Sequence, residues 1–284
     1  MSKEFTKEDV IQNKKESIKT LNKMLESFIN NPTGKYLKKA HLIAYWIKDY
    51  VRMINFEEKF DSTKNIAYKR GNIVKLNFGF NIGSEYGGLH YGVVLDNKND
   101  HHSPVLTIIP LTSIKAGKEI HPNSIELGTE IYHSLKLKYD TISKALVNEK
   151  LEIQNTLALF NDLLDLALES AKELEQYKEG KMDDSVYQTK IFKTTKYINA
   201  ARELQETWAE KSEHNSKEQI YLNKIGDEIS KMKEGSIALV NQITTVSKIR
   251  IFDPRNLKGV LYGISLSEES MEKINQKVKE LYVF

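Results

Sequence analysis

Three apolar runs rich in β-branched residues lie close together in the first half of the chain, at Ile73–Phe78, Tyr91–Leu95 and Val105–Leu111. In the first run apolar residues alternate with the polar residues Lys75 and Asn77. A two-residue period is typical of a strand with one buried face. The pattern therefore predicts three neighbouring strands of a mostly antiparallel sheet.

Two helical patterns precede these strands. Residues 4–30 and 35–58 place apolar side chains three and four positions apart, as an amphipathic helix does. Pro32 and Gly34 lie between the two patterns and break the helix. We expect residues 1–66 to form a helical hairpin that packs on the sheet or on a partner. The alternative interpretation is a lid over a binding groove.

A longer helical pattern occupies residues 138–234. Apolar stripes run from Ile142 to Leu174, from Tyr187 to Trp208 and from Leu222 to Met232, with the three-four spacing of paired helices. We expect the segment to satisfy these stripes internally, as an antiparallel helical hairpin or a three-helix bundle inserted between strands. Its role is structural in one interpretation, and binding of a partner or an antitoxin in the other.

Short strands and one last helix are expected on either side of this segment. Ser124–Leu127 and Thr129–Tyr132 are predicted strands, and strands resume at Ser236. Ser267 precedes two glutamates and an apolar stripe, which is typical of a helix N-cap. The sequence therefore predicts a helix over 267–282.

The composition is that of a cytoplasmic protein with a polar surface. The 284 residues are 40% hydrophobic and 29% charged, and they include no cysteine. No apolar run approaches the roughly 18 residues of a membrane span, so no membrane association is expected. Residues 138–234 contain 15 Lys/Arg and 19 Asp/Glu, a net charge of −4, and the remainder contains 27 and 20, a net of +7. A basic remainder suits a partner that carries phosphate groups.

The connection between the first two strands is a candidate binding loop. Residues 79–88 include four glycines, too many for a helix. Glycine accepts positive φ angles and allows close approach of a ligand. The third strand ends in Pro110–Ser113, which places two hydroxyl groups at a strand end. Together these segments predict a site.

These segments resemble the MazF/PemK family of toxin endoribonucleases in their order and spacing. The matching segments are Arg70–Val74, Gly83–Gly88, Val93–Val94 and Pro110–Ser113, with Gly235–Arg250 similar to a later element of the family. The resemblance covers 67–137 and 235–284. It implies an α+β fold, in which a small, mostly antiparallel SH3-like β-barrel of the CcdB/MazF/PemK type carries an N-terminal helical hairpin, an inserted helical bundle and a C-terminal helix.

The resemblance also implies a toxin that cleaves single-stranded RNA without a metal, leaving a 2′,3′-cyclic phosphate and a 5′-hydroxyl. Thr112 matches the catalytic threonine of the family, whereas His90 stands where the family has an arginine. An arginine stays charged and stabilises the phosphorane, but a histidine exchanges protons near neutral pH. We expect His90 and Thr112 to be catalytic, with Glu85 orienting His90 or acting as a base. The alternative is a structural histidine in a member with weakened activity.

The remaining site predictions concern binding. His121 is a second acid–base candidate, and His101 and His102 lack a nearby carboxylate at ligand spacing, so neither a metal nor a cofactor is predicted. The residues expected to bind substrate are Ser84, Gly87, Gly88, Ser113, Lys115, Lys118 and Arg70.

The expected partners follow from the same resemblance: single-stranded RNA as substrate, a second copy in a homodimer, and an antitoxin that is a protein rather than an RNA. Two alternatives stay open. One is a non-catalytic toxin that binds a protein, as CcdB does. The other is a nuclease of the ToxN/AbiQ kind, which shares the barrel, carries added helices and is controlled by an RNA.

Overall fold

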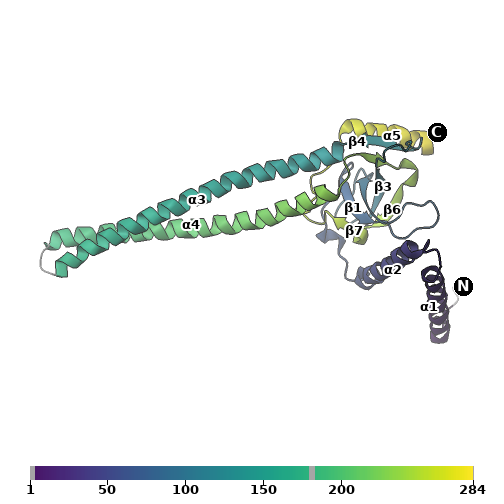
Figure 1. Cartoon of the computed structure of the whole chain (residues 1–284), viewed down its shortest axis with the longest axis horizontal. Helices are drawn as coiled ribbons and strands as arrows, with labels where there is room; N and C mark the ends of the chain where they lie inside the picture. Colours follow the sequence, from purple (N-terminus) through teal and green to yellow (C-terminus); the bar gives the residue numbers. More distant parts are fainter. Residues whose placement is uncertain (1–3, 179–182, 284) are drawn as a thin grey trace.

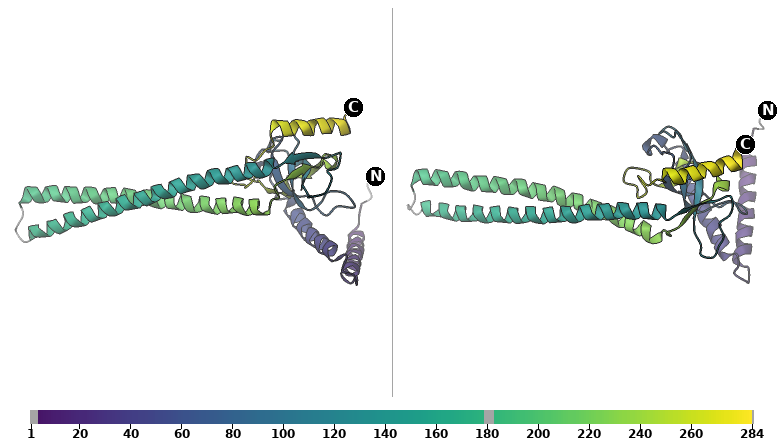
Figure 2. Two further views of the ribbon diagram at one scale, coloured as in Figure 1. Left: turned by 45° about the horizontal axis from the view of Figure 1, so that its top comes forward. Right: turned by 90° about the horizontal axis from the view of Figure 1, so that it is seen from above.

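A computed structural model describes residues 4–178 and 183–283. The predicted N-terminal hairpin, helical insertion and C-terminal block also include residues 1–3, 179–182 and 284, which lie outside the described residues. Figure 1 shows three parts: a β-sheet body covered by the C-terminal helix, a long helical hairpin that extends away from it, and two N-terminal helices beside the sheet. The hairpin projects from the body in each of the further views (Figure 2).

Seven strands form one antiparallel sheet in the order β4-β5-β3-β2-β1-β7, with β6 also paired to β3. Strands from the two sequence blocks therefore share one sheet. Among the described residues β4 and β7 do not pair, so the sheet is open, and the expected closed barrel is not formed by hydrogen bonding. These end strands have only four and three residues, which offer few backbone groups for closure. The strands are β1 Ile73–Asn77, β2 Leu89–Val94, β3 Val105–Ser113, β4 Ile125–Gly128, β5 Ser236–Ala238, β6 Thr244–Ser247 and β7 Ile251–Asp253.

Strand β1, which lies between β2 and β7, is buried on both of its faces. Val74 and Leu76 belong to one hydrophobic cluster with Phe78, whereas Ile73 belongs to a second cluster on the opposite side. The alternation in the sequence predicted only one buried face. The polar residue Asn77 on the other face is also buried, and its side chain accepts a hydrogen bond from the Gly79 amide at 2.9 Å.

Two long helices make the hairpin: α3 (Glu130–Lys178) and α4 (Asp184–Lys231). They pack against each other along their length (Figures 1 and 2). The segment is thus a hairpin rather than a three-helix bundle, because the predicted third helix continues α4. The predicted strand Thr129–Tyr132 is also wrong, since helix α3 begins at Glu130. Ile131 and Leu135, four positions apart, both point into the core, which favours a helix there.

The base of the hairpin shares its core with the sheet. Ile131 and Leu135 of α3 and Ile225 of α4 lie in the same cluster as Val93 of β2, and Met232 joins them just after α4. The expectation that the insertion satisfies its apolar stripes alone is therefore wrong at this end.

Three more helices complete the fold. The helix α1 (Lys7–Ile29) buries no side chain, and α2 (Leu37–Glu57) buries only Ala40 and Ile43. The Arg250 guanidinium lies 5.2 Å from the centre of the Trp46 ring, so α2 contacts the sheet body through a cation–π pair. The helix α5 (Glu268–Tyr282) is N-capped by Ser267, as predicted, and packs beside β4. Short 3-10 turns occur at Ser62–Lys64, Val240–Gln242 and Lys248–Arg250.

The shared core predicts where the hairpin can be shortened. Replacing residues 151–211 by a short Gly/Asn linker should leave a folded protein, because the buried residues at the base are kept. Deleting 141–232 removes Ile225 and Met232. Because burial of each side chain stabilises the fold by about 1.5–3 kcal/mol, this deletion should unfold the body. Thermal unfolding followed by circular dichroism compares the two. A 141–232 deletion that melts with the intact protein would contradict the shared core.

Candidate functional site

Strands β2 and β3 bring His90 and Thr112 to one pocket. His90 pairs in register with Leu76 of β1, and Thr112 pairs with Ile237 of β5. A pocket of about 310 Å³ is lined by both His90 and Thr112. Ser113 also lines it, so a histidine and two hydroxyl groups surround one cavity.

The glycine loop shapes the surroundings of His90. A Cβ at Gly88 would lie 3.4 Å from His90 Nε2, and Gly88 has φ +93°, a conformation suited to glycine. At Gly87 a Cβ would lie 2.7 Å from the Gly79 carbonyl oxygen, so only glycine fits there. Burial lowers the pKa of His90, while a hydrogen bond to the Gly87 backbone acts in the opposite direction. The net result favours neutral imidazole near pH 7, the form that accepts a proton.

Tyr86 is a site residue that the sequence analysis missed. Its ring centre lies 4.6 Å from that of His90. Its hydroxyl donates a hydrogen bond to the Leu111 carbonyl oxygen at 2.7 Å, and its amide donates to the Gln242 side chain at 3.2 Å. Tyr86 therefore ties the glycine loop to β3 beside Thr112 and positions the imidazole. Its place directly before the glycine pair Gly87-Gly88 was the available signal.

Three lysines line the His90 pocket: Lys75 of β1, Lys231 at the end of α4, and Lys233 just beyond it. Lys75 Nζ lies 2.5 Å from Glu228 Oε1 of α4, so its charge is balanced. Lys231 and Lys233 form no ion pair with other described residues. These two lysines supply positive charge beside His90, where the family arginine is missing. The signal available in the sequence was the apolar residue Met232 between them, which is buried in the structure.

Glu228 also fixes the wall of the pocket. It accepts a hydrogen bond from the Tyr91 hydroxyl in addition to that from Lys75. Burial and the bond to Glu228 raise the pKa of Tyr91, so this phenol stays protonated and donates. The hairpin is thereby joined to both β1 and β2 next to His90.

Part of the predicted binding set lies in an adjoining pocket. Thr112 and Ser113 also line a smaller cavity of about 130 Å³ together with Lys115 and Lys118. His121 lies there too, and its Nδ1 accepts a hydrogen bond from the Asn123 amide at 3.1 Å. The two cavities share Thr112 and Ser113, but Lys115 and Lys118 line only the smaller one.

The comparisons with known proteins bear on this site. Residues 69–158 match the family model described as "PemK-like, MazF-like toxin of type II toxin-antitoxin system". This segment is therefore similar to a PemK-like toxin domain. A comparison with curated proteins gave no match. A type II system pairs its toxin with a protein antitoxin, so the family implies a protein partner. The matched segment includes His90 and Thr112 but ends within α3, so Lys231 and Lys233 lie outside it.

Two predicted residues of the PemK-like domain, Glu85 and Ser84, lie away from the His90 pocket. Glu85 is exposed, and its carboxylate accepts a hydrogen bond from the Ile82 amide at 3.2 Å. It lines two other cavities, of about 570 and 410 Å³. The Ser84 carbonyl oxygen accepts a bond from the Gln242 side chain at 3.4 Å. The structure therefore gives neither residue a contact with His90.

Arg70 has a structural position in the PemK-like domain. Its guanidinium donates hydrogen bonds to the Leu95 carbonyl oxygen and, at 2.6 Å, to Asn275 of α5. It joins β2 to the C-terminal helix and does not line the His90 pocket. Among the helices described, none combines the length and apolar character that crossing a membrane requires.

The lowered pKa of His90 is directly measurable. NMR titration of the imidazole, assigned with a His90→Asn variant, should give a pKa below the usual value of about 6.5. Because the folded-state pKa is lowered, the stability contributed by neutral His90 is present above about pH 6.5 and is lost as the pH falls. Urea unfolding at pH 7.5 and 5.5 should show a smaller pH dependence in His90→Asn. A His90 pKa above the usual value would contradict the effect of burial.

Proposed function

We propose that the protein is a metal-independent endoribonuclease toxin that cleaves single-stranded RNA. The observation that carries the proposal is one pocket lined by His90, whose pKa is lowered, by Thr112 and by two lysines that form no ion pair with described residues. Cleavage of RNA by its own 2′-hydroxyl needs a base, a group that holds the extra charge on phosphorus, and an acid for the leaving oxygen. The pocket contains a side chain for each task.

In the proposed reaction His90 takes the proton of the 2′-hydroxyl. The 2′-oxygen then bonds to phosphorus, and the bond from phosphorus to the 5′-oxygen breaks. Hydroxyl groups of Thr112 and Ser113 donate hydrogen bonds to the phosphate, and the ammonium groups of Lys231 and Lys233 balance its added charge. One of these ammonium groups protonates the leaving 5′-oxygen. The products are a 2′,3′-cyclic phosphate and a 5′-hydroxyl.

The lysines take over the charge role that arginine has in the resembled family. A guanidinium at position 90 would be permanently charged, whereas His90 supplies proton transfer and leaves charge stabilisation to Lys231 and Lys233. The cytoplasmic location and the homodimer stay predictions. The alternative is a non-catalytic toxin that binds a protein target, as CcdB does. A protein that cuts no RNA in the cleavage assay below would favour this alternative.

Cleavage of a long unstructured RNA in EDTA tests the proposal. Discrete cuts with cyclic phosphate ends are expected from the intact protein. His90→Ala should lower the rate by roughly 10²–10⁴, the usual contribution of a general base. His90→Arg should keep part of the activity and lose the dependence on a group that titrates near neutral pH. Thr112→Ala should weaken cleavage without changing the melting temperature. Full activity in His90→Ala would move the chemistry to another residue.

The lysine pair has its own test. Replacing Lys231 and Lys233 by glutamine should lower kcat/KM by roughly 10- to 100-fold, because a hydrogen bond to a charged group contributes about 1.5–3 kcal/mol. The steepness of the salt dependence should fall as well, since fewer phosphate charges are neutralised. The matched control replaces Lys136 of α3 and Lys224 of α4, exposed lysines that do not line the pocket, and should change neither quantity. Equal losses in both double variants would show a general charge effect.

A further inference from the structure

The outer half of the hairpin has a weak seam of its own. The side chains that meet between α3 and α4 there include Ala167, Ser170, Thr194 and Ala201, all small and buried. Ser170 and Thr194 form a side-chain hydrogen bond of 2.6 Å across the seam. Small and polar seam residues bury little apolar area, so this half gains little from pairing two helices alone.

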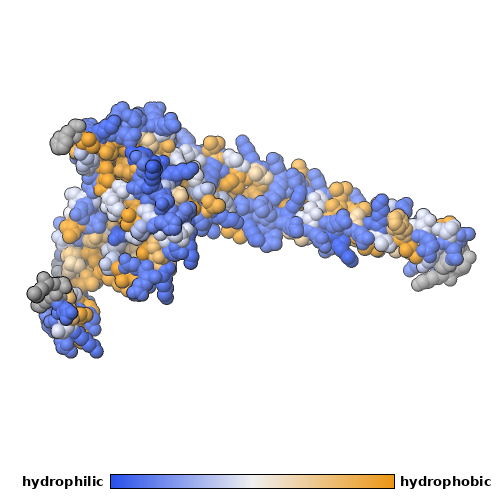
Figure 3. Space-filling model, turned by 180° about the vertical axis from the view of Figure 1, so that it is seen from behind, coloured by the Kyte–Doolittle hydropathy of each residue, from blue (hydrophilic) through white to orange (hydrophobic). Residues whose placement is uncertain are grey.

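Larger apolar side chains flank this seam and face water. Leu159 and Leu166 of α3 are 56% and 43% exposed, and Val186 of α4 is 45% exposed. In α3 the seam positions recur every three and four residues. Leu159, Leu166 and Glu173 each come one position before a seam residue, so all three lie on the same side of the seam. Apolar patches also interrupt the hydrophilic surface along the hairpin in Figure 3, which shows one side of it.

The two helices carry opposite charge along this half. Residues 159–175 of α3 hold five acidic residues and one basic residue, a net charge of −4. Residues 186–202 of α4 hold four basic residues and no acidic residue, a net charge of +4. Glu173 and Lys190 pair within the hairpin, but Glu169 forms no ion pair with described residues. The surface is thus acidic on one helix and basic on the other.

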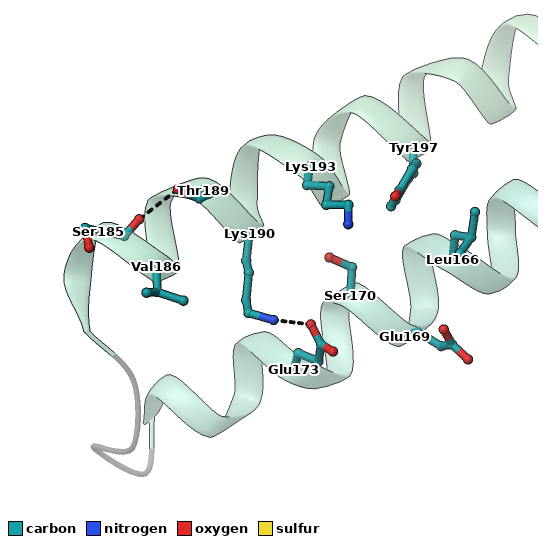
Figure 4. A pocket seen from close by; sticks show the side chains of 10 residues that line it. All are labelled: Leu166, Glu169, Ser170, Glu173, Ser185, Val186, Thr189, Lys190, Lys193 and Tyr197. Atoms are coloured by element: carbon teal, nitrogen blue, oxygen red, sulfur yellow. Dashed lines mark hydrogen bonds and ion pairs between the residues drawn. The ribbon is translucent and has the colours of Figure 1, made fainter.

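A groove of about 440 Å³ lies on this side (Figure 4). Figure 4 shows Val186 and Lys193 of α4 turned toward α3, and Glu169 at the edge of the groove. We call the side formed by the groove and its flanking residues the distal hairpin face. Its members are Leu159, Leu166, Glu169, Glu173, Val186, Lys190 and Lys193.

We propose that the distal hairpin face binds the same face of a second copy of this chain, forming a four-helix bundle with both hairpin tips at the same end. A two-fold axis along the helices lays acidic α3 of one copy on basic α4 of the other, twice by symmetry. A two-fold axis across the helices would lay acidic α3 on acidic α3, and like charges in contact oppose association. In a four-helix bundle the residues that flank the seam also enter the core, which covers Leu159, Leu166 and Val186.

Charge reversal in the full-length protein tests the pairing. One variant, Glu169→Lys with Glu173→Lys, makes the face wholly basic, and another, Lys190→Glu with Lys193→Glu, makes it wholly acidic. The chain has no cysteine, so Asn199→Cys accepts a single spin label on the outer surface of α4. In the labelled parent at micromolar concentration, pulsed EPR should find labels of two copies within roughly 40 Å, because bundled helices pack about 8–10 Å apart.

In each reversed variant alone, the short distance between labels should disappear, and the dissociation constant of the dimer should rise by roughly tenfold or more. An equimolar mixture of the two should regain it, since acidic then faces basic at both contacts. The control reverses Asp165 and Lys172, on the outward side of α3, and should keep the distance.

Helix content by circular dichroism confirms that the variants fold. Labels that stay far apart in the parent would overturn the proposal. So would a distance that is unchanged in the variants or is not restored in the mixture. A dimer held only by the toxin domains would give the same mass in every variant and no short distance between tips. RNA cleavage is not a readout here, so the result is independent of the proposed reaction.

Discussion

The packing of the hairpin base against the sheet is the contact on which the candidate site depends. Within two turns of α4, Ile225 enters the core beside the sheet, and Glu228 accepts hydrogen bonds from Tyr91 and Lys75. A buried polar group that loses its partner costs about 1–3 kcal/mol, so removing Glu228 would leave Tyr91 and Lys75 with that cost. The same stretch leads directly to Lys231 and Lys233. A segment that the sequence presents as an insertion is therefore one wall of the pocket.

In the proposed reaction, charge stabilisation and proton transfer belong to different residues of the pocket. Burial lowers the pKa of His90 and so favours its uncharged form. In the proposed reaction this neutral imidazole accepts the proton, and the separate positive charges of Lys231 and Lys233 stabilise the phosphorane. Lys231 and Lys233 are exposed and keep their hydration until a phosphate enters, so their charge adds little desolvation cost to the free protein. The arrangement is consistent with a site that binds an anion and removes a proton beside it.

Local patterns in the sequence predicted local structure well. The strand runs, the two N-terminal helices and the Ser267 cap follow from side-chain period and capping, which act over a few residues. The start of α3 was missed because a β-branched pattern over four residues fits a strand and a helix end equally. Tyr86 and Lys231 were missed for a different reason, since their place in the site depends on contacts between distant segments. Arg70 matched a family motif, but its guanidinium is held by Leu95 and α5.

The two helices of the hairpin follow one spacing pattern but meet two different environments. At the base the seam residues are large and the sheet covers them, whereas farther out the seam is small and the larger residues flank it. A period of three and four residues shows which side of a helix faces the partner helix. It does not show whether that partner alone buries the apolar side chains. Side-chain size and the opposite charges of α3 and α4 carry that second information. If two copies pair with their tips together, both sheet bodies lie at one end of the bundle. Because α4 continues from the distal hairpin face to Lys231, the pairing would then also set the separation of the two pockets.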